Sequence, residues 1–336
     1  MTKRILLSLF LAAGAAGPAL AQVPAPMAPM APAVPASTSA VLQSKDSYPA
    51  SVLTGEAPRY VSEAVERKPF ESDRAFSGFI GPVSNPVLAK DPRSSTEARF
   101  LFINNTFPSD HALGGGNFQV YALQLRAALT DRLTLIADKD GFASISAKGL
   151  DHRVGLLNMN FGLRYLLVRD VENQFMLSTG FTLEPPMGYR NVFENHGNGV
   201  MSVFATAAKE IDCNWHLIHT TGYQFGLNGD QNSAFFYNST HVDRRILGFL
   251  YPLVEFNWFH YNHGGNRGLP AALGEGDGLL NLGTSGVAGN DLVTCAAGLK
   301  IKVNDYMETG CVYEVPLTNR KDMIQNRITF DFVLRY

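Results

Sequence analysis

The sequence lacks long apolar runs after residue 21, and it has few cysteines and few charges. Its 336 residues include 3 Cys, an odd number without a CxxC spacing, which argues against a disulfide framework or a cysteine zinc site. Charged residues make up 17% and the formal net charge is −2, so no basic field favours nucleic acid, and we predict no nucleic-acid partner. No later window approaches the roughly 18 continuous apolar residues of a membrane-spanning helix. If the chain enters a membrane, it does so without such helices.

Residues 1–21 have the features of a secretory signal peptide. A basic start at Lys3 and Arg4 precedes an apolar stretch over residues 5–17, and the small residues of Ala19–Ala21 end it. The apolar stretch is shorter than the ~20 residues that span a bilayer. No cysteine follows the expected cleavage site, so we predict no lipoprotein anchor.

The last ten residues alternate between apolar and polar side chains. One face of an extended strand would carry Ile328, Phe330, Phe332, Leu334 and Tyr336, and the other Arg327, Thr329, Asp331 and Arg335, with Val333 as the exception. Bulky apolar side chains on one face, charges on the other and an aromatic last residue are typical of a lipid-facing barrel wall. Residues 157–167 repeat the pattern, with Leu157 and Met159 predicted on the apolar face.

Residues 97–336 consist of alternating segments separated by turn residues, which predicts an all-β fold: a closed antiparallel transmembrane β-barrel of about twelve strands. The predicted strands are 97–107, 117–129, 133–146, 154–168, 174–184, 200–211, 215–225, 234–243, 247–261, 291–303, 306–317 and 324–336. Short polar connections alternate with long ones, as periplasmic turns and extracellular loops do. The polar segment 141–153 does not define where the third strand ends, which leaves the count open by two. A soluble secreted sheet protein, with a second sheet over the apolar face, is the alternative.

Two further segments lie between the signal peptide and the barrel. Residues 22–40 are rich in proline and alanine and cannot bury a core, so we predict a disordered linker. Residues 41–96 are mixed and end in the turn-rich stretch FSGFIGPVSNPVLAKDPRSS. We predict a periplasmic N-terminal segment, and its pattern leaves open whether it is a free arm or a partial plug.

The alternating strands and the FDFVLRY terminus resemble those of Gram-negative outer-membrane β-barrels. More loosely, residues 97–336 are similar to the outer-membrane transporters grouped with the phenol-degradation MetA-pathway proteins. The resemblance implies an outer-membrane location with the N-terminal segment in the periplasm. It also implies outer-membrane lipids as partners, and recognition of the strand Arg327–Tyr336 by the barrel assembly machinery. It says nothing of oligomeric state or substrate.

The predicted inner face of the barrel carries charges of both signs. We expect these residues to line the lumen: Arg126, Asp138, Arg164, Glu184, Glu255, Lys300, Glu308, Glu314, Arg327, Asp331 and Arg335. A mixed lumen predicts a channel or uptake transporter through which small molecules diffuse passively, without steep charge selection. The alternative is that these charges pair across strands and seal the lumen, which would leave a structural or adhesive barrel without a pore.

No motif in the sequence indicates catalysis, a cofactor or a metal site. Gly114–Gly116 lacks the Lys and Ser/Thr of a phosphate-binding loop. The histidines at 216 and 219, and at 260 and 263, are three apart and face opposite sides of a strand. No spacing marks a nucleophile with its base, so an outer-membrane lipid hydrolase or acyltransferase is a remote alternative. The glycine-rich loop 262–290 contains short apolar pieces, and we hypothesise that it folds inward over the mouth.

Overall fold

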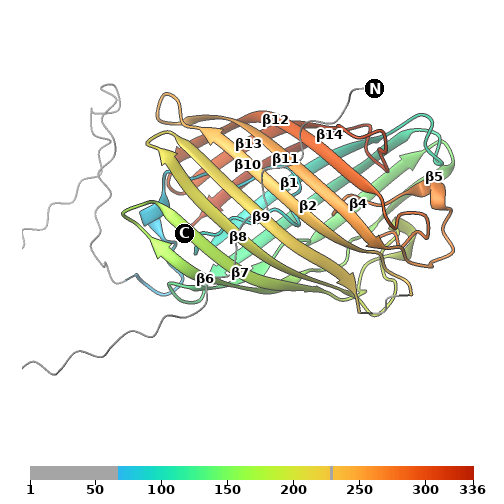
Figure 1. The fold of residues 1–336 in the computed structure, drawn as a ribbon, viewed down its shortest axis with the longest axis horizontal. Coiled ribbons are helices and arrows are strands. Elements are labelled where there is room, and N and C mark those ends of the chain that lie inside the picture. The colour runs from blue at the N-terminus through green and yellow to red at the C-terminus, as the bar shows by residue number, and fades with distance from the viewer. Residues whose placement is uncertain (1–66, 228–229) are drawn as a thin grey trace, which may run out of the picture. The chain divides into compact units, whose positions relative to one another are not determined.

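In the computed structural model, which describes residues 67–227 and 230–336, every strand belongs to one antiparallel sheet (Figure 1). The strands are β1 (Glu97–Phe107), β2 (Gly116–Ala128), β3 (Leu133–Ala137), β4 (Gly141–Ala147), β5 (Leu150–Leu156), β6 (Phe161–Asp170), β7 (Phe175–Glu184), β8 (Val200–Asp212), β9 (Trp215–Gly226), β10 (Ala234–Arg244), β11 (Leu250–His263), β12 (Asp291–Asn304), β13 (Met307–Pro316) and β14 (Asn326–Arg335). The predicted signal peptide, the linker 22–40 and residues 41–66 lie outside the described residues. Within the described ranges, no helix is long and apolar enough to cross a membrane.

The sheet closes on itself because β1 pairs with both β14 and β2. Glu97 lies opposite Arg335 on one side and opposite Arg126 on the other. β3 and β4 both pair with β2, so they are successive parts of one wall strand, and β5 and β6 form the next one in the same way. The described residues therefore form a closed barrel of twelve wall strands, and the predicted fold class is confirmed.

Two wall strands are interrupted where the sequence predicts continuous ones, over residues 138–140 and 157–160. In a regular strand Lys139 would face outward next to the inward Asp138. The break lets Lys139 turn inward, where its Nζ lies 2.7 Å from Glu184 and 2.8 Å from Glu194. The second break turns Leu157 inward to 5% exposure. The prediction that Leu157 shares the outer face was therefore wrong, although Met159 does lie there, 50% exposed.

The outer face of the barrel is apolar, and the inner face is buried. Phe256, Tyr313 and Phe330 are 46%, 51% and 44% exposed on three different strands, while Val333 points inward and is buried. Since all strands of the described residues lie in one sheet, no second sheet covers this apolar face. The soluble-sheet alternative is therefore wrong, and exposed apolar surface all round a closed barrel suits contact with hydrocarbon.

The two ends of the barrel differ in their connections. At the short-turn end, where β14 ends, wall strands are joined over residues 129–132, 171–174, 213–214, 245–249 and 305–306. At the opposite, long-loop end, strands are joined over residues 108–115, 185–199, 227–233 (of which 228–229 lie outside the described residues), 264–290 and 317–325, and by a tight hairpin at 148–149. Tyr336 hydrogen-bonds at the short-turn end to the backbone of Ser72 and Thr96, so the described N-terminal residues start at that end.

Candidate functional site in the barrel interior

Residues 76–95, which we call the inner segment, lie inside the barrel (Figure 1). All of them are buried except Ser77, which is half-buried, and none belongs to a strand. Their hydrogen bonds reach wall strands on different sides. Examples run from Arg99 (β1) to the Pro82 carbonyl at 2.7 Å, from Ser178 (β7) to the Pro92 carbonyl at 3.0 Å, and from Asn85 to Ser239 (β10) at 2.9 Å. A single segment can reach all of these strands only from within the closed barrel.

The inner segment begins and ends at the short-turn end. The Asp73 amide donates to the Ser94 carbonyl at 2.8 Å, and the Thr96 amide donates to the Ser72 hydroxyl at 2.9 Å. Between these contacts the chain runs into the barrel and returns. The sequence left open whether this region is an arm or a plug, and residues 76–95 lie in the lumen.

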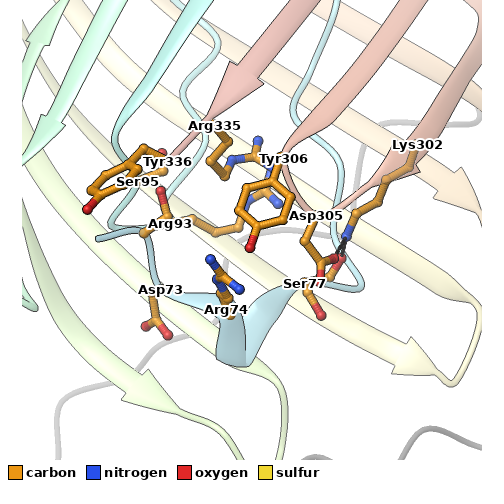
Figure 2. Close-up of a pocket in the computed structure, with 11 residues that line it drawn as sticks. Asp73, Arg74, Ser77, Arg93, Ser95, Lys302, Asp305, Tyr306, Arg335 and Tyr336 are labelled. Carbon is orange, nitrogen blue, oxygen red and sulfur yellow. Dashed lines mark hydrogen bonds and ion pairs between the residues drawn. The ribbon is translucent and has the colours of Figure 1, made fainter. Parts of the chain in front are cut away.

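A small polar cavity remains where the inner segment meets the short-turn end (Figure 2). Arg74, Arg93, Lys302 and Arg335 surround it together with two tyrosines, and the Arg74 guanidinium lies 4.7 Å from the ring centre of Tyr306. The cavity volume is about 20 Å³. Because one water needs roughly 10–15 Å³, this space holds a water or two and no larger solute.

The loop 264–290 fills the lumen from the long-loop end. Its residues Leu279, Leu280 and Leu282 are buried in one apolar cluster with Leu88 of the inner segment and Phe259 of the wall. The predicted inward fold of this loop is confirmed. The inner segment and the loop therefore meet inside the barrel and close it from opposite ends.

Glu275 holds the loop 264–290 in its folded shape. Its carboxylate accepts hydrogen bonds from the Ser233 hydroxyl and from the backbone amides of Leu282 and Thr284 at 2.5, 2.8 and 3.1 Å. Burial raises its pKa from 4.5 to about 7. Burial and the neighbouring Asp322 also raise the pKa of Asp277 in the same loop. The folded loop therefore holds protons that a released loop would lose.

We predict that the loop 264–290 packs most firmly below about pH 4.5 and loosens as the pH rises through about 7. A group whose pKa is higher in the packed state stabilises packing at low pH, and for Glu275 the loss amounts to about 3 kcal/mol above pH 7. An environment-sensitive dye at the exposed Ala272, recorded from pH 4 to 9, would follow the release. Glu275→Gln should flatten the curve, and an unchanged curve would contradict the assignment to Glu275.

Four of the predicted inner-face residues bind the inner segment directly. Asp138 forms an ion pair with Lys90 of the segment at 2.5 Å, and Lys300 donates a hydrogen bond to the Gly81 carbonyl at 3.1 Å. Arg164 donates to the carbonyls of Asp91 and Arg93. Glu255 accepts hydrogen bonds from the backbone amides of Val83 and Ser84. These wall residues use backbone groups as well as side chains of the segment. The wall residues therefore hold the backbone of the inner segment in place, in addition to neutralising its charged side chains.

The other predicted residues mostly pair within the wall. The pairs join Arg126 to Glu97, Glu184 to Lys139, Arg327 to Glu314, Arg335 to Glu308 and Glu97, and Asp331 to Arg99 and Lys300, at 2.7 to 3.4 Å. Glu308 also lies 4.0 Å from Arg93 of the inner segment. Paired buried charges of both signs leave a wall that is polar and nearly neutral.

Sequence reasoning missed the partners of these wall residues. Lys90, Asp91 and Arg93 lie in a segment without periodic pattern, so nothing local placed them in the lumen. His241 and Asp243 are two apart on β10 and buried on its inner face, a spacing that could have placed them there.

The histidines at 216 and 219 lie on opposite faces of the wall, as predicted. His216 is fully buried inside, whereas His219 is half-buried and bonds Thr240 at 2.9 Å. Among the described residues no group of three His, Cys, Asp or Glu side chains is arranged to hold a metal ion. The three cysteines are free.

Comparison with known proteins supports the architecture. No protein-family model and no curated protein matches the chain. Among solved structures, the chain is similar to an outer-membrane channel from Pseudomonas putida F1, with a TM-score of 0.55 and 13% identity over 77% of this chain and 100% of that one. It also matches the NanC porin (TM-score 0.44, 7% identity, 72% of this chain and 99% of the porin) and the KdgM porin (0.40, 10%, 72% and 99%). At this identity the likeness to the channel shows the fold alone, which is that of an outer-membrane β-barrel.

Proposed function

We propose that the chain is an outer-membrane channel for small polar molecules, closed in this conformation by its inner segment together with the loop 264–290. One observation carries the proposal: residues 76–95 enter and leave at the same end and belong to no strand. The segment can therefore withdraw without breaking a single strand pairing of the barrel. The likeness to a solved outer-membrane channel is consistent with this function.

The inner wall supports passage of small polar solutes without steep charge selection. Its charged side chains are of both signs, and many are paired with each other, as Arg126 is with Glu97 and Arg335 with Glu308. Once the inner segment leaves, water can solvate these pairs and a polar solute can exchange hydrogen bonds with them. The resemblance to MetA-pathway transporters is compatible with uptake.

We also propose that outer-membrane lipids cover the apolar outer face and that the N-terminal segment lies in the periplasm. The short-turn end would face the periplasm, as it does in outer-membrane barrels. The strand Arg327–Tyr336 would be recognised by the barrel assembly machinery. Its apolar side chains other than Val333 point outward, and the terminal Tyr336 is exposed at the short-turn end.

A structural or adhesive barrel without a pore is the second candidate, because the interior is filled. The cavities near either end have volumes of only about 20 and 10 Å³. Such a barrel would keep its inner segment in place permanently, and its buried ion pairs would serve stability alone.

Recordings from the purified full chain in planar bilayers test the proposal. We expect brief stepwise currents that rise from a closed baseline, because the inner segment must leave before ions pass. Refolding is verified beforehand by the shift in gel mobility on heating. A folded barrel that shows no steps, even after removal of the elements that fill its lumen, would support the barrel without a pore.

A further inference from the structure

We propose that four side chains on β9, β10 and β11 form a latch that holds the inner segment closed. The latch consists of Glu255, His241, Asp243 and His216, joined in that order by hydrogen bonds. It touches the inner segment at both of its ends. The proposal rests on the proposed function only in treating release of the inner segment as opening of a channel.

The four side chains form one continuous chain of short contacts. Nδ1 of His241 lies 2.6 Å from Oε1 of Glu255, and Nε2 of the same ring lies 2.9 Å from Oδ2 of Asp243. The other oxygen of Asp243 lies 2.7 Å from Nδ1 of His216. All four residues are at most 2% exposed, so water does not compete for these bonds.

The arrangement fixes the charge of His241. Ionised carboxylates only accept hydrogen bonds, so a ring with a carboxylate at each nitrogen must donate from both and is an imidazolium. His216 has a carboxylate at Nδ1 only, and its buried Nε2 has no hydrogen-bond partner. A neutral ring there avoids burying an unpaired N–H group. The latch therefore alternates carboxylate, cation, carboxylate and neutral ring.

Glu255 binds the backbone of the inner segment. Its two carboxylate oxygens accept hydrogen bonds from the amides of Val83 and Ser84 at 2.8 and 2.5 Å. Hydrogen bonds to an ionised acceptor are roughly twice as strong as neutral ones. His241 orients this carboxylate through Oε1, so it is a positioning residue that acts on the segment through its neighbours in the latch.

The other end of the latch packs against the segment by ring contact. The ring centre of His216 lies 4.8 Å from that of Phe79, which precedes Val83 in the inner segment. The ring centre of Tyr251 lies 6.2 Å from that of His216. A change in the middle of the latch therefore affects two places on the segment together.

Labelling of a buried cysteine on the inner segment tests the latch without relying on current. The reporter is Ser84→Cys in the full chain, with the three native cysteines replaced by alanine, and the readout is its rate of reaction with a water-soluble maleimide. Glu255→Gln removes the charge and leaves one carbonyl oxygen for two amides, and His241→Gln removes the cation. We expect each to raise the labelling rate roughly tenfold or more, because a hydrogen bond to a charged group contributes about 1.5–3 kcal/mol.

Two matched variants separate the latch from general loosening of the wall. Glu184→Gln neutralises a buried inner-face carboxylate whose partners are Lys139 and Asn158, and His219→Gln replaces a histidine of β9 that bonds Thr240. In both control variants, the Ser84→Cys reporter should react with the maleimide at the same rate as in the reporter protein without further substitution. The double variant Glu255→Gln/His241→Gln should label less fast than the product of the two single effects predicts, since Glu255 and His241 share one hydrogen bond.

The results distinguish the latch from the channel. Unchanged labelling in both latch variants, or an equal rise in the control variants, would overturn the latch even if the wild-type protein conducts. Faster labelling confined to the latch variants supports the latch. If that occurs while no variant passes current, the latch stands and the channel function fails.

Discussion

Removal of both the inner segment and the loop 264–290 is expected to turn the closed barrel into an open pore, with a roughly 100-fold rise in mean current per barrel. Removal of either one alone should raise the current far less. The two elements fill opposite halves of the lumen and meet at the cluster of Leu88, Leu279 and Phe259. They act as resistances in series, so the remaining one still limits the current.

The structure shows where each element can be cut. Asp73 and Ser94 are joined by a hydrogen bond of 2.8 Å, so a few glycines can replace residues 74–93. Tyr261 pairs with Gly289 and Asn290 at 2.7 and 3.0 Å, so residues 265–288 can be replaced in the same way. Neither cut removes a residue of the wall strands. The barrel should therefore still close between β1, β2 and β14.

A length-matched variant controls for the change in chain length. It keeps residues 74–93 as a glycine and serine sequence, which cannot form the ion pair of Lys90 with Asp138 or the bonds of Asp91 and Arg93 to Arg164. We expect noisy, partly blocked currents from this variant in the loop-deleted background. If the variant that lacks both elements folds correctly and passes no current, the channel function is contradicted. If deletion of residues 74–93 alone already gives the full current, the loop 264–290 does not limit flow.

A disulfide between the inner segment and the wall is expected to abolish current reversibly. The side-chain amide nitrogen of Asn257 lies 3.0 Å from the hydroxyl of Ser84, so these two side chains face each other, and we expect Ser84→Cys and Asn257→Cys to form a disulfide on oxidation. The native cysteines are replaced by alanine to prevent other pairings. Oxidation then fixes residue 84 to β11, and each single-cysteine variant shows whether oxidation alone has any effect.

The sequence predicted the wall of this barrel better than its contents. Lipid on one side and protein on the other impose a period of two, which is why Phe330 and Asp331 could be assigned to opposite faces. The same period placed Arg164, Glu255 and Lys300 on the inner face. The face on which such a residue lies depends only on strand geometry and on which side is lipid, and the alternation of apolar and polar neighbours in the sequence shows both.

The interruptions and the inner segment could not be predicted in this way. Lys139 leaves the regular strand because Glu184 and Glu194, 45 and 55 positions later, offer it partners inside. The inner segment has no period because its residues bond wall strands on different sides of the lumen, as Asn85 does with β10 and Pro92 with β7. Such positions are decided by residues far away in the sequence, so no local pattern marks them.

The most direct measurement is the current through a single membrane that holds the Ser84→Cys/Asn257→Cys protein, oxidised at first and then reduced by a water-soluble thiol. If the inner segment must leave the lumen for ions to pass, the oxidised barrel is silent and stepwise currents appear after reduction. Steps of equal size and frequency before and after reduction would show that ions pass with the segment fixed in place, which would contradict this mechanism of closure.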